Sequence, residues 1–482
     1  MSSAFVDELT AICDAERVVT HPDALRTYES DGLLQYRALP RAVVLPDTVE
    51  EVQRIVKLCH DRGVPWVARG AGSGLSGGAL PVEEGVLIVL ARMRRIVEVD
   101  ILNQRVVVEP GVTNIDISNA VAPTHFYPPD PSSQVVCSIG GNVAENSGGA
   151  HCFKYGFTTN YVTGLKVVLP DGSIEQLGGK GVDNPDYDLL GAFVGSEGTL
   201  GVAVEITLRV VPKPAAVRTL VAFFDHTSEA GQAVSDIVSA GLVPAAMEMM
   251  DRLSIEAAEG ATHAGYPTEA GAALIVELDG SEAECELGFE RVEEICDRNG
   301  SWEIRIAENE LDRELIWKTR KAAFAAMGRI SPNYYVQDSV IPRTKLPEVL
   351  SRIDELSEEY GLRVANVFHA GDGNLHPLVC YDGANPGEAE RAEELAGLIV
   401  AVCVDAGGSI TGEHGVGVDK KRYMPRMFGE PDLAAFQKLR CAFDPSGLAN
   451  PGKVMPTPRL CGEVPGPYRQ HPLEAAGLAE RF

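Results

Sequence analysis

The stretch RGAGSGLSGGAL, residues 69–80, decides which fold the chain can adopt. It follows VPWVA (64–68), whose apolar and β-branched residues predict a strand. A strand that ends in a glycine-rich turn presents consecutive free N–H groups, and these form a nest for a phosphate or another anion. A dinucleotide-binding βαβ unit also needs a helix directly after its glycines. The residues ALPVEEGVLIVL (79–90) instead read as a loop and a strand, so the sequence excludes that unit.

Three more glycine-rich loops lie in the same part of the chain, namely SIGGN (138–142), NSGG (146–149) and GSEGTLG (195–201). A single loop of this kind is often a plain turn. Four of them are enough to wrap a long, polyphosphorylated cofactor.

The elements around these loops indicate an α+β protein. Residues 46–63 predict a helix that begins with a capping box of Asp47 and Glu50 and ends at Gly63. Residues 95–100 and 104–111 predict a hairpin. Beyond residue 214 strands alternate with amphipathic helices, which predicts a second α+β domain to about residue 440, followed by a turn-rich tail.

A second group of motifs carries imidazole and carboxylate side chains. FHAGDGNLHP (368–377) places His369 and His376 on either side of a Gly-Asp-Gly turn, and SITGEHGVG (409–417) supplies Glu413 and His414. Two imidazoles and one carboxylate make a good set of ligands for a divalent metal and leave coordination positions open, as a catalytic site requires. The alternative is that these histidines are ordinary loop residues with satisfied hydrogen bonds. His414 is either a general base or a residue that orients Glu413.

Composition excludes several classes of protein. The net charge of −27 disfavours binding to nucleic acid or to an anionic membrane surface. The N-terminal residues are neither basic nor apolar enough for a signal or transit peptide, and no window has the ~18 apolar residues of a membrane span. We therefore expect a cytoplasmic protein. Ten cysteines occur without a CxxC pair, so we expect buried thiols and no iron–sulfur cluster in this chain.

Taken together, the four glycine loops, FHAGDGNLHP, GGSITGEHGVG and FDPSGLANPGK (443–453) resemble the FAD-linked 2-hydroxy-acid oxidases of the vanillyl-alcohol-oxidase superfamily. Within that family the chain is most similar to the catalytic FAD subunits of bacterial glycolate oxidases. The resemblance implies an FAD-binding domain of two subdomains (1–214), an α+β cap domain for substrate and metal (215–440), and a C-terminal tail (441–482) that packs on the FAD domain and returns to the flavin.

The resemblance also implies which residues bind FAD. The pyrophosphate would lie on one loop, the flavin and ribityl chain on two others, the adenosine half near a fourth, and the isoalloxazine near the tail. In that order the residues are Arg69, Gly70, Gly72, Ser73, Gly74, Leu75, Gly77 and Gly78; Pro129, Asp130, Ser133, Ser138, Gly140, Gly141, Asn142, Gly148 and Gly149; Glu197, Gly198, Gly201 and Val202; and Asn450. The FAD would be non-covalent, because RGAGSGLSGG has no histidine where covalently flavinylated relatives carry one. His151 and His125 are the alternative tethers.

In similar enzymes the two histidines and the glutamate hold zinc, manganese or iron, which implies His369, His376 and Glu413 as metal ligands here. His414 and Arg320 would be catalytic, the first as base and the second as partner of the substrate carboxylate. Lys318 and Lys321 are expected to be solvated charges. Relatives that bind a five-carbon diacid carry a lysine and an asparagine where this chain has Val336 or Gln337, and Leu378. The departure favours a short monocarboxylate.

The expected reaction is FAD- and metal-dependent oxidation of glycolate to glyoxylate, with oxidation of D-lactate to pyruvate as the alternative. A second alternative is that the protein is a flavin-binding subunit without catalytic activity. Such a subunit would not need His369, His376, Glu413, His414 and Arg320 in the cap domain. Without clusters of its own, the chain is expected to pass electrons to an iron–sulfur subunit, to associate with a second FAD-domain subunit, and to reach the inner membrane only through a partner. A homodimer is a further arrangement that the resemblance allows.

Overall fold

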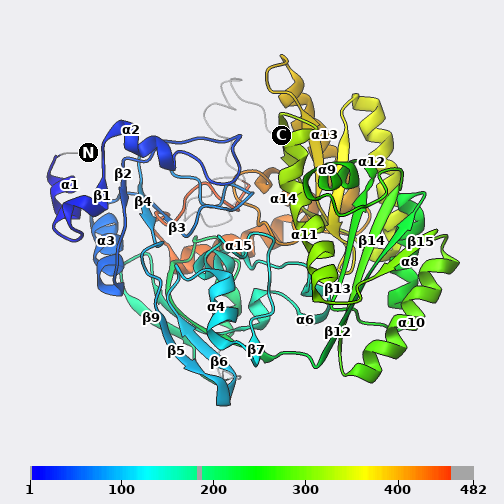
Figure 1. The fold of residues 1–482 in the computed structure, drawn as a ribbon. Coiled ribbons are helices and arrows are strands. Elements are labelled where there is room, and N and C mark those ends of the chain that lie inside the picture. The colour runs from blue at the N-terminus through cyan, green and yellow to red at the C-terminus, as the bar shows by residue number, and fades with distance from the viewer. Residues whose placement is uncertain (1–2, 182–186, 457–482) are drawn as a thin grey trace.

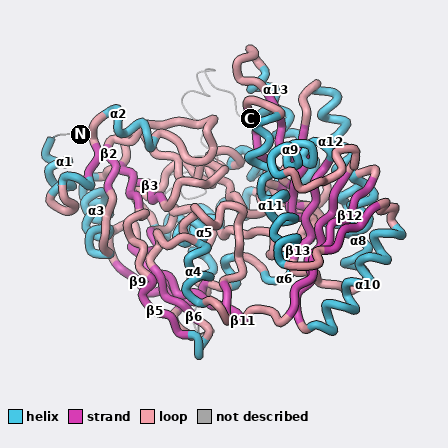
Figure 2. Tube along the Cα trace, in the orientation of Figure 1, coloured by secondary structure: helices cyan, strands magenta, loops and turns pink. Residues whose placement is uncertain are grey.

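The computed structural model describes residues 3–181 and 187–456. They form two α+β parts that lie side by side, one built from the first 212 residues and the other from strands that begin at Ala216 (Figure 1). Loops gather where the two parts meet (Figure 2). Within the described ranges no helix is both long and apolar enough to cross a bilayer.

The first sheet of the N-terminal part contains the strand that precedes the glycine loop. Its order is β1-β2-β4-β3, with β1 antiparallel to β2 and the other pairs parallel. As predicted, no helix follows β3: the chain runs through the glycine loop directly into β4. The strands are β1 Val18–Val19, β2 Ala42–Val44, β3 Trp66–Arg69 and β4 Val86–Val89, and the helices are α1 Ser3–Thr10, α2 Pro22–Leu25 and α3 Val49–Arg62.

Helix α3 is the helix predicted over 46–63, and Gly63 ends it in the left-handed conformation. Its N-cap differs from the prediction. The cap is Thr48, whose hydroxyl accepts a hydrogen bond from the Glu51 N–H, while the Glu51 carboxylate accepts one from the Asp47 N–H. The N-cap is therefore one residue later than predicted, because Thr48 adopts the extended backbone that a cap requires.

The second sheet is antiparallel throughout, with order β5-β6-β10-β8-β9. The pairing of β5 with β6 confirms the predicted hairpin. The strands are β5 Ile96–Asp100, β6 Arg105–Val108, β8 Val162–Val168, β9 Ile174–Gly178 and β10 Val202–Arg209, with a small pair of β7 His125–Phe126 and β11 Val211–Pro212. The helices are α4 Asn114–Val121, α5 Ile139–Glu145, α6 Cys152–Tyr155 and α7 Leu189–Phe193.

The other part is one large sheet between two layers of helices. Its main path is β15-β12-β14-β13-β18-β19-β17, and β20 joins β18 to β16. The strands are β12 Ala216–Phe224, β13 Ala246–Asp251, β14 Ala272–Gly280, β15 Glu303–Ile306, β16 Asn333–Val336, β17 Ser339–Val340, β18 Val364–His369, β19 Asn374–Leu375 and β20 Pro377–Tyr381. The helices of its layers are α8 Thr227–Ser239, α9 Arg252–Thr262, α10 Glu282–Arg298, α11 Glu310–Ala326, α12 Leu346–Tyr360 and α13 Glu388–Asp405. Helices α14 Met424–Met427 and α15 Glu430–Phe443 follow, and α15 lies against the N-terminal part (Figure 1).

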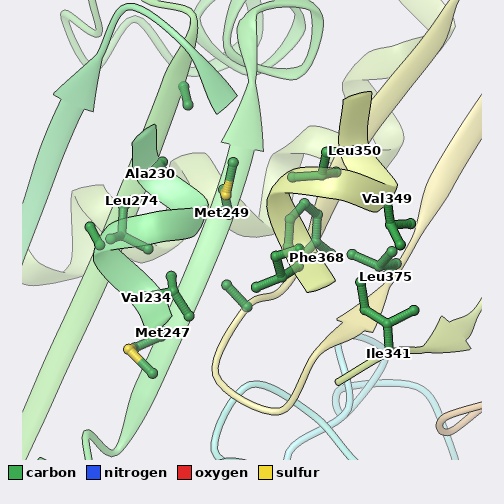
Figure 3. Close-up of a cluster of buried hydrophobic side chains, with 14 of the residues drawn as sticks. Ala230, Val234, Met247, Met249, Leu274, Ile341, Val349, Leu350, Phe368 and Leu375 are labelled. Atoms are coloured by element: carbon green, nitrogen blue, oxygen red, sulfur yellow. The ribbon is translucent and has the colours of Figure 1, made fainter. Parts of the chain in front are cut away.

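Alternation along the strands builds both faces of this sheet. In β12, Leu220, Ala222 and Phe224 face the layer of α8, α10, α12 and α13, whereas Val221 and Phe223 face α9 and α11. Figure 3 shows part of the first face, where Val234 of α8 and Leu350 of α12 lie beside side chains of the strands. Because both faces are covered, a charged side chain inside this sheet must be paired.

The chain then returns to the N-terminal part (orange in Figure 1). The Trp66 N–H donates to Leu448 O and the Asn450 N–H donates to Trp66 O, so residues 448–450 lie beside β3. Helix α15 ends at Phe443, so the first residues of the expected tail, 441–443, are helical. Residues 457–482 of that tail lie outside the described residues.

Candidate active site

The candidate metal ligands are positioned by the end of β18 and the loop before α14. His369 is the last residue of β18, and His376 lies between β19 and β20. The turn between them needs glycine at position 373, where φ is +79° and an added Cβ would lie 2.2 Å from the carbonyl oxygen of Ile341.

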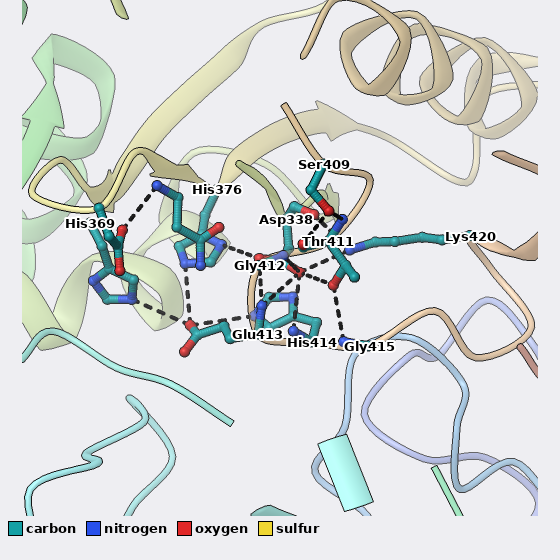
Figure 4. A network of polar contacts seen from close by, with 12 residues as sticks. Asp338, His369, His376, Ser409, Thr411, Gly412, Glu413, His414, Gly415 and Lys420 are labelled. Carbon is teal, nitrogen blue, oxygen red and sulfur yellow. Dashed lines mark hydrogen bonds and ion pairs between the residues drawn. The ribbon is translucent and has the colours of Figure 1, made fainter. Parts of the chain in front are cut away.

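These two histidines and Glu413 converge on one point (Figure 4). His369 Nε2 and His376 Nε2 each lie 3.3 Å from Glu413 Oε1, and all three side chains are buried. One ligand atom from each lies within 4.8 Å of the others. Two atoms bound at about 2.1 Å to one ion are separated by about 3.0–3.4 Å, so the arrangement fits a divalent metal. Glu413 Oε2 is also buried and has no hydrogen-bond partner among the described residues.

Electrostatics favours positive charge at this point. Burial raises the pKa of Glu413, but the hydrogen bonds from His369 and His376 outweigh it and hold the pKa below its usual range. Burial likewise opposes protonation of His369, yet the carboxylates of Glu248 and Glu413 raise its pKa well above the ordinary value. Because the buried carboxylates are negatively charged, the site binds either protons on its histidines or a metal ion between its ligands.

Asp338 shapes the loop that carries Glu413 and His414. Its Oδ2 accepts hydrogen bonds from Thr411 Oγ1, from the backbone N–H groups of Gly412 and His414, and from Lys420 Nζ (Figure 4). Asp338, His376 and His414 form a second group with metal-ligand spacing. Because the Asp338 carboxylate is already occupied by donors, we consider the group with Glu413 the better site.

His414 lies beside the candidate metal site without belonging to it. Its ring stacks on the His376 ring at 5.0 Å, with an angle of 11° between the planes, and its Nε2 lies 4.0 Å from Glu413 Oε1. Burial lowers the pKa of His414 to about 4, so the imidazole is neutral near pH 7. The ring lines a cavity between the two parts.

Glycine lets this loop pack against the first glycine loop of the other part. Gly417 has φ +52°, and an added Cβ would lie 2.0 Å from the carbonyl oxygen of Ser76. The same carbonyl accepts the Val418 N–H, and Glu197 accepts the N–H groups of Val416 and Gly417. The loop with His414 is therefore fixed to loops that we predicted to bind the cofactor.

A cavity of about 760 Å³ lies between the two parts, in the size range of ligand sites. His376, Glu413 and His414 line it together with Phe324, Tyr334, Val336 and Tyr381. Of the predicted FAD residues, the structure places nine at this cavity: Gly70, Gly72, Ser73, Gly74, Leu75, Ser133, Ser138, Gly141 and Asn142.

A smaller recess of about 70 Å³ shares Gly70, Gly141 and Glu145 with the cavity, and it is lined by Arg69, Gly78, Gly140, Glu197, Gly198, Gly201 and Val202. The other six predicted residues, Gly77, Pro129, Asp130, Gly148, Gly149 and Asn450, line neither space. Asn450 supports the loops instead, because its amide donates to Gly78 O and Glu197 O.

Arg320 and Lys321 differ in how they lie relative to the cavity. Arg320 is buried, does not line the cavity, and forms an ion pair with Glu248 at 2.5 Å. Lys321, which we predicted to be a solvated charge, is exposed and lines the cavity. One helical turn separates Arg320 from Phe324, whose ring stands at the cavity wall.

The two alternative flavin tethers lie away from the cavity lining. Both ring nitrogens of His151 are engaged, Nδ1 with Asp130 at 2.8 Å and Nε2 with Glu277 at 3.3 Å. The His125 ring contacts Thr124.

Sequence reasoning missed Glu248 and Asp338. Glu248 is the charged residue in the otherwise apolar run AMEMM, and that pattern could have indicated a paired carboxylate within a buried strand. No local signal links Asp338 to residues 411–414.

Comparison with solved structures shows the fold. The chain aligns with p-cresol methylhydroxylase with bound substrate at a TM-score of 0.79 and 18% identity, over 94% of this chain and 96% of that one. It aligns with alkyldihydroxyacetonephosphate synthase at a TM-score of 0.73 and 20% identity, over 94% of this chain and 85% of that one. Both alignments cover 94% of this chain and confirm the expected α+β fold class.

Sequence comparison shows the family. Residues 40–178 match the FAD binding domain, and residues 213–454 match the C-terminal domain of FAD linked oxidases. The chain is 51% identical over 456 residues to the glycolate oxidase subunit GlcD of Escherichia coli strain K12, covering 94% of this chain and 91% of that one. The chain is 39% identical to the glycolate oxidase subunit GlcD of Bacillus subtilis, over 89% of this chain and 91% of that one. It is 32% identical to the D-lactate dehydrogenase of Anaerostipes hadrus, over 91% of this chain and 94% of that one. The chain belongs to the FAD-linked oxidase family and is an FAD-dependent oxidoreductase.

Proposed function

We propose that this protein oxidises glycolate to glyoxylate with FAD and a divalent metal, and that the electrons pass to a separate acceptor. The observation that carries the proposal is the convergence of His369, His376, Glu413 and His414 at the cavity that the glycine loops line. The relatives named as glycolate oxidase subunits support this substrate, and those named as D-lactate dehydrogenases make D-lactate the second candidate.

His369, His376 and Glu413 would hold the ion, as zinc, manganese or iron. When bound, the ion would supply a Lewis acid for the substrate hydroxyl and FAD would supply a hydride acceptor. His414 receives the hydroxyl proton at Nε2, the ring nitrogen nearest Glu413. Asp338 positions the main chain of His414, because its Oδ2 accepts the backbone N–H of that residue.

The FAD would be non-covalent and would lie along those predicted residues that line the cavity and the smaller recess. Two features support this: residues 69–78 contain no histidine, and both ring nitrogens of His151 are engaged. Acid precipitation should leave the flavin in the supernatant. Flavin that precipitates with the polypeptide would contradict non-covalent binding.

The wall of the cavity favours a short substrate. Val336 and Leu378 are cross-strand partners, Val336 lines the cavity, and Leu378 is fully buried, so neither gives a distal carboxylate a partner. We retain Arg320 as the partner of the substrate carboxylate, because its buried Nε has no hydrogen-bond partner within the described residues. Lys321 is the second candidate, since it already lines the cavity.

The acceptor is proposed to be an iron–sulfur subunit, with a second FAD-domain subunit or a second copy of this chain as further partners. The absence of CxxC pairs from the sequence and the word subunit in the relatives' names support such an assembly. The alternative role of a flavin-binding subunit without catalytic activity would not account for the buried cluster of His369, His376 and Glu413.

Anaerobic bleaching of the flavin by glycolate, D-lactate, L-lactate and D-2-hydroxyglutarate tests the proposal. We expect glycolate, or else D-lactate, to exceed D-2-hydroxyglutarate in kcat/KM by at least about tenfold, or ~1.4 kcal/mol. An equal or reversed preference would contradict the argument from Val336 and Leu378. Failure of every 2-hydroxy acid to bleach the flavin would contradict the function itself.

A further inference from the structure

We propose that Glu248 is a positioning residue that fixes both His369 and Arg320, and so sets the affinity of the site for its metal. The proposal rests on the metal site proposed above and adds to it a residue that lies 121 positions from His369 in the sequence.

Strand register places Glu248. Every residue of β13 is buried, and Glu248 is 1% exposed. In the antiparallel pairing of β13 with β18, Glu248 lies directly opposite His369. Cross-strand partners have Cβ atoms about 4.5–5.5 Å apart, so the two side chains meet as a consequence of the sheet itself. The sheet is an appropriate support, because it holds them more rigidly than a loop would.

The contact with His369 selects one form of the imidazole. Glu248 Oε1 lies 2.6 Å from His369 Nδ1. An ionised carboxylate can only accept, so Nδ1 donates and carries the ring proton. In the neutral ring this leaves the lone pair on Nε2, the nitrogen that faces Glu413. A carboxylate on the far nitrogen of a metal-binding histidine fixes its orientation and raises its basicity.

The other carboxylate oxygen holds Arg320. Glu248 Oε2 and Arg320 form an ion pair at 2.5 Å, with both side chains no more than 2% exposed. The pair balances two charges that would be costly to bury separately. Glu248 therefore links the proposed carboxylate partner on α11 to the proposed metal ligand on β18.

Glu277 provides a matched control within the same sheet. It lies on β14, is also 1% exposed, and also pairs with an arginine and a histidine, Arg313 and His151. Its remaining side-chain hydrogen bonds come from Thr219 and Trp317, so none of these partners is His369, His376 or Glu413. Replacing it removes a buried carboxylate of the same kind without touching His369.

The experiment is a competitive titration of metal-free, FAD-loaded protein with Zn²⁺ against a chromophoric chelator. The proteins compared are wild type, Glu248→Gln, Glu277→Gln and the double variant Glu248→Gln with Arg320→Met. The double variant is included in case Glu248→Gln folds poorly, because it also removes the Arg320 charge that would lose its partner. We expect Glu248→Gln and the double variant to bind Zn²⁺ about 10–100-fold more weakly, and Glu277→Gln to match wild type within about twofold. Saturating Zn²⁺ should restore kcat in Glu248→Gln, as expected for a positioning residue.

The outcomes separate this proposal from the one on which it rests. Wild-type affinity in the Glu248→Gln protein, or in the double variant if the single variant does not fold, would overturn the positioning role and leave the metal site intact. An equal loss in Glu277→Gln would also overturn it, because the effect would then be general to buried carboxylates. If wild type itself binds no Zn²⁺, the metal site and the role of Glu248 both fail.

Discussion

The histidines of this protein differ in role because their immediate partners differ. His369 and His376 share the Glu413 carboxylate, His414 has a neutral ring at the cavity, and His151 has both nitrogens in ion pairs. The short motif at 368–377 predicts that His369 and His376 meet, and the structure brings the two rings together. The partnership of Glu248 with His369 could not be predicted, because it depends on the register of two strands distant in sequence.

The first prediction concerns His376→Ala. The substitution removes one of three converging ligands, so bound metal and activity should fall together. FAD content should persist, because the glycine loops belong to the other part of the molecule. Elemental analysis and the flavin absorbance band measure the two quantities. Normal flavin reduction by this variant after chelation would mean that the cluster is structural.

His414→Ala should fail in a different way. The ring is not among the three converging ligands, so both metal and FAD should be retained. Flavin reduction in stopped flow should slow by roughly 10²–10⁴-fold, the usual contribution of a general base. Loss of metal with little further defect would instead make His414 a support of Glu413, and another group would have to take the proton.

At the scale of elements, local patterns predicted what local interactions determine. Helix α3, the hairpin of β5 and β6, and the loop after β3 followed from periodicity, turn residues and the absence of a helix pattern. The contact between the loop at 411–417 and the loop at 69–78 was beyond that reasoning. It depends on Gly77 and Gly417 lying where an added Cβ would collide, at Gly77 with the Val418 side chain and at Gly417 with the Ser76 carbonyl oxygen.

Gly417→Ala should therefore disrupt the site without changing any chemical group in it. The left-handed backbone costs alanine about 1–2 kcal/mol, and the collision with Ser76 O adds roughly 1–3 kcal/mol. Gly63→Ala is the matched control, since Gly63 has a similar φ of +62° but nothing within 4 Å of the added Cβ. The temperature of thermal unfolding and the FAD content should both fall clearly more in Gly417→Ala than in Gly63→Ala. Equal behaviour of the two variants would show that the contact between the loops is unimportant.

At the scale of the whole molecule, polar contacts join the two parts next to the cofactor loops. The Lys154 ammonium and the Tyr155 hydroxyl both bond the Asp279 carboxylate. His151 bridges Asp130 of the N-terminal part and Glu277 of the large sheet, and its ring stacks on Trp317. The sequence indicated two α+β parts but no interface, because none of these residues forms a motif with its partner.

The contacts of His151 with Asp130 and Glu277 predict how the stability of the folded protein should depend on pH. Burial opposes protonation of His151, but the charges and hydrogen bonds of Asp130 and Glu277 outweigh it and raise its pKa to about 10. The unfolded value is about 6.5. A raised pKa in the folded state means that the stabilisation is fully present below pH ~6.5 and is lost as pH rises toward about 10.

His151→Gln should remove that contribution, on the order of a few kcal/mol at pH 6.5, while Asp130, Glu277 and Arg313 remain. The measurement is the free energy of unfolding in denaturant between pH 6.5 and 9.5, taken as the difference between wild type and variant so that other titrating groups cancel. That difference should be largest at pH 6.5 and shrink with rising pH. A His151→Gln difference that stays constant with pH would mean that the imidazole acts by packing on Trp317, and that its charge does not hold the two parts together.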